Sequence, residues 1–105
     1  MDNQQDDELQ LEKKIENAKL QIKQLLADLL TDDYLSFLSV PTSDSLRKIK
    51  ETDDLSRLVS LRRSLELHIA PGEEQRRLRN PQIIFPMFKE KIVKLIVLID
   101  EISIQ

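Results

Sequence analysis

The sequence predicts an all-α fold, a small helical bundle with coiled-coil-like packing of long N-terminal and C-terminal helices. Gly72 is the only glycine among 105 residues, which is too few for the several tight turns that a sheet protein of this size needs. Charged residues make up 33% of the chain, and Leu, Glu, Lys, Arg and Gln, which favour helices, are abundant. Apolar residues recur at helical spacing near both ends, which indicates amphipathic helices.

The length predicts a single helical domain, 1–105, in which residues 1–5 are expected to be flexible. The first helix is expected at about 6–30. Its apolar positions are separated by four, three, four, three and four residues, which is a heptad pattern: Leu11, Ile15, Ala18, Ile22, Leu25 and Leu29. Leu26 and Leu30 widen this stripe at its C-terminal end.

Three helices are predicted in the middle of the chain, at about 32–39, 44–51 and 53–69. Pro41 is expected to end the first, because the residue before a proline is disfavoured in the α region. Side chains that cap helix N-termini precede the other two, Ser43 or Asp44 and then Thr52. Tyr34 and Phe37 in the first of these helices are expected to plug one end of the bundle.

A short polar helix is predicted at 73–79 and a final apolar helix at 86–103. The final helix has Phe88, Ile92, Leu95, Ile99 and Ile102 at spacings of four, three, four and three. Many of its residues are β-branched, so residues 92–104 could alternatively form an intermolecular strand. No other region offers a strand to pair with, which favours the helix. The predicted core is Leu11, Ile15, Ile22, Leu25, Leu29, Leu58, Leu65, Phe88, Ile92, Leu95, Ile99 and Ile102.

The residue content argues against an enzyme, and we expect no catalytic site, no metal site and no cofactor. The chain has no cysteine, which excludes disulfides, thiol catalysis and thiolate metal ligands. His68 is the only histidine and is expected at the surface or its boundary. Adjacent acidic residues point to different sides of a helix and do not converge on one atom.

The N-terminus is acidic and polar, unlike a signal peptide. No apolar run approaches the roughly 20 residues that a membrane span requires. We therefore expect a cytoplasmic or nuclear protein with no transmembrane segment. Its charge is uneven, because residues 1–45 carry ten acidic and four basic side chains, whereas residues 46–79 carry nine basic and six acidic ones.

The apolar helix surface exceeds what one small bundle can hide. This predicts a non-enzymatic protein–protein interaction module, a dimerising or assembly subunit of a larger intracellular complex. The partner is expected to be a second copy or another helical subunit. The expected interface consists of Ile92, Val93, Ile96, Val97, Ile99, Leu26 and Leu30.

Two alternative functions remain open at this point. One is a nucleic-acid-binding helical domain that uses the Arg-rich centre. Its candidate contacts to phosphate or to an acidic partner are Arg62, Arg63, Arg76, Arg77 and Arg79. The weaker one is a C-terminal helix lying on a membrane surface with Lys89, Lys91 and Lys94 toward the headgroups, against which Asp100 and Glu101 argue.

Overall fold

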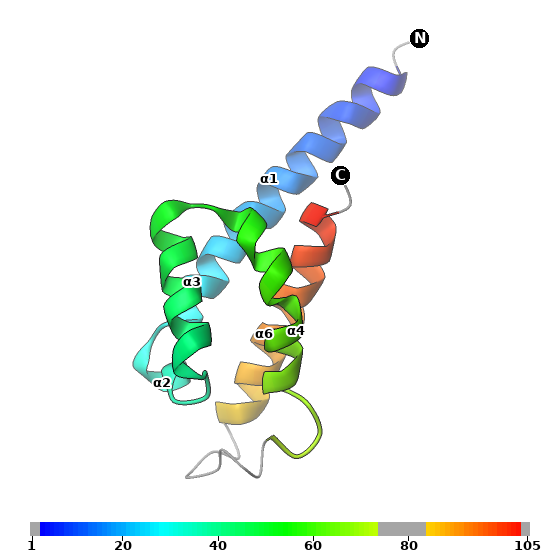
Figure 1. Cartoon of the computed structure of the whole chain (residues 1–105). Coiled ribbons are helices and arrows are strands. Elements are labelled where there is room, and N and C mark those ends of the chain that lie inside the picture. The colour runs from blue at the N-terminus through cyan, green and yellow to red at the C-terminus, as the bar shows by residue number, and fades with distance from the viewer. Residues whose placement is uncertain (1–2, 74–83, 104–105) are drawn as a thin grey trace.

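The computed structural model describes residues 3–73 and 84–103, which form an all-α bundle without strands in these ranges (Figure 1). Its helices are α1 (Asn3–Leu29), α2 (Asp32–Leu35), α3 (Val40–Thr52), the 3-10 turn η1 (Leu55–Arg57), α4 (Leu58–His68) and α6 (Ile84–Ser103). The predicted all-α fold is confirmed. Residues 92–103 are helical, so the strand alternative is wrong for them. The predicted helix at 73–79 lies, apart from its first residue, outside the described residues.

Helix α6 is the central element of the bundle. It packs against α1 on one side and α4 on another, while α3 packs against both α1 and α4. Helices α1 and α6 run in opposite directions, which brings both ends of the chain toward the same end of the molecule (Figure 1). The predicted packing of the first and last long helices is therefore confirmed.

Nine of the twelve predicted core residues are buried, namely Ile22, Leu25, Leu29, Leu58, Leu65, Phe88, Ile92, Leu95 and Ile99. The predicted burial of Leu11 is wrong, because its side chain is 55% exposed. Ile15 and Ile102 are half-buried. The physical reason is the length of α6, which runs beside only the C-terminal part of α1. Among residues 8–29, the first that is fully buried is Ala18.

All four aromatic side chains of the protein meet at one end of the bundle. The Phe88 ring lies 5.2 Å from that of Phe37 and 6.4 Å from that of Tyr34, centroid to centroid. Phe85 completes the cluster, 5.6 Å from Phe37. Offset and tilted ring pairs at these separations add to the free energy of area burial. The predicted plug formed by Tyr34 and Phe37 is thus seen, with α6 supplying the other half.

The start of α3 differs from its prediction. Pro41 does not end the preceding helix, which already stops at Leu35; it occupies the first turn of α3. Proline is tolerated there because the amide it lacks would have no partner inside the helix. Ser39 is the N-cap, and its hydroxyl accepts a hydrogen bond of 3.3 Å from the Thr42 amide. The predicted caps Ser43 and Asp44 lie inside the helix.

The connection from α3 to α4 also differs. Thr52, the expected N-cap, is the last residue of α3, and its hydroxyl donates to the Lys48 carbonyl at 2.8 Å. Asp53 then adopts a left-handed backbone with φ of 60°, a conformation that aspartate tolerates better than most residues. The predicted helix at 53–69 is therefore η1 followed by α4. At the other end of the chain, residues 3–5, which were expected to be flexible, belong to α1.

Candidate protein-interaction surface

The N-terminal half of α1 projects beyond the bundle, with no other described helix beside it (Figure 1). We call residues 3–15 the overhang. A helix rises about 1.5 Å per residue, so the overhang is roughly 20 Å long. It exposes two large apolar side chains, Leu9 at 54% and Leu11 at 55%. Isolated helical segments of this length are marginal in water, so the overhang gains stability from anything that covers it.

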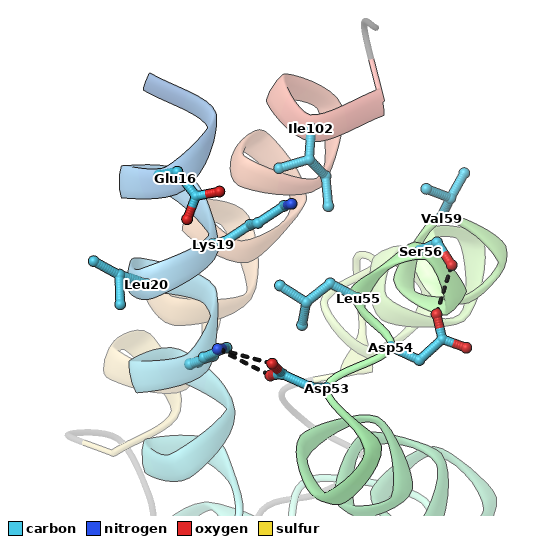
Figure 2. A pocket seen from close by; sticks show the side chains of 10 residues that line it. Glu16, Lys19, Leu20, Asp53, Asp54, Leu55, Ser56, Val59 and Ile102 are labelled. Carbon is cyan, nitrogen blue, oxygen red and sulfur yellow. Dashed lines mark hydrogen bonds and ion pairs between the residues drawn. The ribbon is translucent and has the colours of Figure 1, made fainter. Parts of the chain in front are cut away.

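A groove of about 480 Å³ lies next to the overhang, between α1 and the η1–α4 segment (Figure 2). It exists because α1 and α4 each pack mainly on α6, which leaves the space between them open near the C-terminal end of α6. The residues lining it are Glu16, Lys19, Leu20, Lys23, Asp53, Asp54, Leu55, Ser56, Val59 and Ile102.

The groove is of mixed character, since four of its lining residues are apolar and six are polar or charged. Leu55 and Ile102 point into it, whereas Leu20 lies on the outer side of α1 and is 58% exposed (Figure 2). The Lys23 ammonium pairs with the Asp53 carboxylate at 3.0 Å across one end. Amphipathic helices bind in grooves through their apolar face, and Leu55, Val59 and Ile102 are the apolar contacts that the groove offers such a partner.

A second hollow, of about 270 Å³, lies between α1 and α6. It is lined mostly by polar side chains, and the Lys91 ammonium in it pairs with the Asp28 carboxylate at 3.2 Å. The Lys91 ammonium also lies 5.7 Å from the centre of the Tyr34 ring. Within residues 3–73 and 84–103, no three histidine, aspartate or glutamate side chains are grouped so that they could hold a metal ion.

Packing within the bundle buries part of the partner interface that the sequence predicted on α6 and at the end of α1. Ile92, Ile99 and Leu26 are fully buried in the chain's own core, so a partner cannot reach them in this conformation. The cause is that α1 and α4 cover α6 from two sides. Val93 and Val97 remain exposed, at 44% and 51%. The remaining two predicted residues, Ile96 and Leu30, are half-buried against the core.

The candidate cationic site consists of one arginine that makes contacts within the bundle, one exposed arginine, and three arginines that lie outside the described residues. The Arg62 guanidinium donates two hydrogen bonds to the Asp100 carboxylate, at 2.8 and 3.0 Å, and also contacts Glu66. The bond to Asp100 raises the pKa of Arg62 above its ordinary value, because it stabilises the charged form. Arg62 thus ties α4 to α6. Arg63 is exposed on α4, and Arg76, Arg77 and Arg79 lie outside the described residues.

The structure argues against the membrane-surface alternative, because the main apolar face of α6 is covered by other helices. That alternative required isoleucine and leucine side chains of α6 to insert into lipid, yet Ile92, Leu95 and Ile99 are fully buried between helices. Among the described helices, none combines the length and the apolarity needed to cross a membrane.

His68 is the residue that sequence reasoning placed worst. It was expected at the surface or its boundary, but its side chain is only 5% exposed. Its Nε2 accepts a hydrogen bond of 3.1 Å from the Ser39 amide, and its Nδ1 lies 2.6 Å from the Ser64 carbonyl oxygen. An amide can only donate and a carbonyl can only accept. The imidazole is therefore neutral, with its proton on Nδ1, and it joins the start of α3 to the end of α4.

Replacement of His68 by alanine is expected to lower the free energy of unfolding by roughly 1–3 kcal/mol, because the part-buried Ser39 amide loses its partner. Urea unfolding followed by circular dichroism measures this loss. The matched control is Leu67→Ala at the neighbouring exposed position, for which a change within about 0.5 kcal/mol is expected. Equal losses in the two variants would contradict the assigned role of His68.

Comparison of the chain with protein-family models, with curated proteins and with solved structures returned no match. The class that the fold defines is an all-α helical bundle.

Proposed function

We propose that the protein is a non-enzymatic helical interaction module, an assembly subunit that joins a larger complex through the overhang and the adjoining groove. The observation that carries the proposal is the exposure of Leu9, Leu11 and Leu20 on a helix that extends past its own bundle. Leu9 and Leu20 share one side of α1, whereas Leu11 lies on the side that continues into the core stripe. Apolar side chains exposed on an uncovered helix are available to a partner. The proposal places this subunit in the cytoplasm or nucleus, in keeping with a chain that has no cysteine.

The structure lends less support to nucleic-acid binding. Phosphate contacts require cationic side chains that are free to approach the backbone of the nucleic acid. In the described part of the chain, Arg47, Arg57 and Arg62 each pair with a carboxylate of the protein itself. The exposed leucines of the overhang and the apolar part of the groove instead favour protein recognition through a helix.

The test uses Leu20→Glu, which places a charge on the outer side of α1 beside the groove without disturbing a buried side chain. Complexes are isolated from the source cells with the wild-type chain and with the variant. Each partner found with the wild type is then purified and recombined with both chains. We expect Leu20→Glu to lower affinity for the purified partner at least tenfold, since a desolvated charge at an apolar contact is costly.

The matched control is Val40→Glu, at an exposed position in the first turn of α3, where a negative charge suits the helix dipole. It is expected to bind like the wild type. Both variants should keep the thermal midpoint of the wild type, because both sites are exposed. A partner that binds Leu20→Glu and the wild type equally well would refute the proposed interaction surface.

A further inference from the structure

One face of α1 has a self-complementary pattern. Leu9, Lys13, Glu16 and Leu20 follow one another at spacings of four, three and four residues, so they lie on one side of the helix. We call these four residues the outer face. All four are exposed, whereas Ala18, Ile22, Leu25 and Leu29, which share the opposite side, are buried in the core. The outer face is therefore free to contact another molecule.

The order of residues on the outer face is apolar, basic, acidic, apolar. If a second α1 lies antiparallel, with a twofold axis between positions 14 and 15, Leu9 falls opposite Leu20 of the second copy. Lys13 then falls opposite Glu16 of the second copy, and both pairings occur twice by symmetry. A parallel arrangement would place lysine against lysine and glutamate against glutamate, which is unfavourable. The pattern thus selects the antiparallel arrangement.

The opposite charges of this register are confined to the outer face. Lys23 takes no part in them, because its ammonium already pairs with the Asp53 carboxylate of the same chain at 3.0 Å. The two Lys13–Glu16 cross-pairs therefore supply the charge complementarity of the arrangement. Charge complementarity of this kind fixes orientation and register.

We propose that the partner of the outer face is a second copy of this chain, bound antiparallel along α1 so that Leu9 of each copy contacts Leu20 of the other. This deepens the proposed function and rests on it, since it names the occupant of the same surface. Leu20 lies on the outer side of α1 at the margin of the groove (Figure 2), so the partner's Leu9 contacts it outside the groove. The overhang of each copy is then covered by the α1 of the other.

The experiment is sedimentation equilibrium of the full chain at low salt, from micromolar to millimolar concentration. Wild type is compared with Lys13→Glu, Glu16→Lys and the double variant that carries both changes. Each single change turns two attractive cross-pairs into repulsive ones, so we expect dimerisation to weaken roughly tenfold. The double variant restores opposite charges at both cross-pairs and should dimerise about as strongly as the wild type.

Circular dichroism of each variant at low concentration serves as the control, because a loss of helix would weaken association for another reason. High salt should shrink the differences between the variants, since exposed charges are then screened. A monomer at every concentration overturns the inference. A dimer that the single changes leave unaltered, or that the double change fails to restore, overturns it as well.

Failure of this inference is distinguishable from failure of the proposed function. A wild-type chain that stays monomeric, yet loses a complex with another protein on Leu20→Glu, refutes the dimer and keeps the interaction module. A chain that dimerises as expected, but whose complexes with other proteins are unchanged by Leu20→Glu, keeps the dimer and refutes the use of this surface for assembly with other proteins.

Discussion

Replacement of Phe88 by alanine is expected to lower the free energy of unfolding by about 3–5 kcal/mol, the usual cost of removing a buried phenylalanine. Phe88 is fully buried and contacts the rings of Tyr34, Phe37 and Phe85. Its removal leaves a cavity that these rings cannot fill without leaving their own packing. Small domains are stable by about 5–15 kcal/mol, so this single change removes a large share of the total.

Urea unfolding monitored by circular dichroism gives the loss for Phe88→Ala directly. The matched control is Met87→Ala, one residue earlier on α6 but exposed to solvent, with an expected change within about 0.5 kcal/mol. A loss for Phe88→Ala below about 1 kcal/mol would mean that the aromatic cluster does not hold α2 to α6 as described.

Replacement of Ile99 by alanine is expected to cost about 2–5 kcal/mol of unfolding free energy. This residue decides between two interpretations of α6, because the sequence alone placed it both in the core and in a partner interface. The structure buries it completely, between helices of its own chain. The loss should therefore appear in unfolding at any protein concentration, including concentrations at which no complex forms.

The comparison is with Val97→Ala, two residues earlier on the same helix and 51% exposed. We expect its unfolding free energy to stay within about 0.5 kcal/mol of the wild-type value. If Ile99→Ala instead weakened only association with a partner and left the unfolding of the single chain unchanged, the packing of α1 and α4 around α6 would be wrong.

The helical periods of the sequence were sufficient to predict the fold class and most of the core. The stripe from Ile22 to Leu29 and the stripe from Phe88 to Ile99 are buried as their spacing indicates. Spacing reports which side of a helix is apolar, and it does not report how long the neighbouring helix is. Leu11 was misplaced for that reason, since its stripe continues past the end of α6.

The start of α3 combines a local cap with a contact to a residue far away in the chain. Ser39 begins α3 with its amide bonded to His68, which is 29 residues away in the chain. Pro41 was interpreted as the end of the preceding helix although it stands in the first turn after the Ser39 cap, so the predicted caps were placed four or five residues too late. The same distant contact explains why a solitary histidine, expected at the surface, is buried.

The candidate site was predicted only in outline. An excess of apolar helix surface was recognised, but Ile92, Ile99 and Leu26 were assigned to the interface although α1, α4 and α6 cover one another at these positions. Leu9 and Leu20 were missed because they lie off the main stripe of α1. The signal that could have found them is the repeat of four, three and four residues on the opposite side of the same helix.

The pairing of two α1 helices is tested most directly by disulfide exchange, because the chain contains no cysteine of its own. Leu9→Cys and Leu20→Cys proteins are mixed in equal amounts in a thiol–disulfide buffer, with Val40→Cys as a control for random collisions. Antiparallel pairing predicts that disulfide-linked dimers contain mainly one chain of each kind. In that arrangement the two copies of position 9 are roughly 16 Å apart along the helix axis, well beyond the reach of a disulfide. A predominance of Leu9→Cys chains linked to each other, or no linkage above that of Val40→Cys, would contradict it.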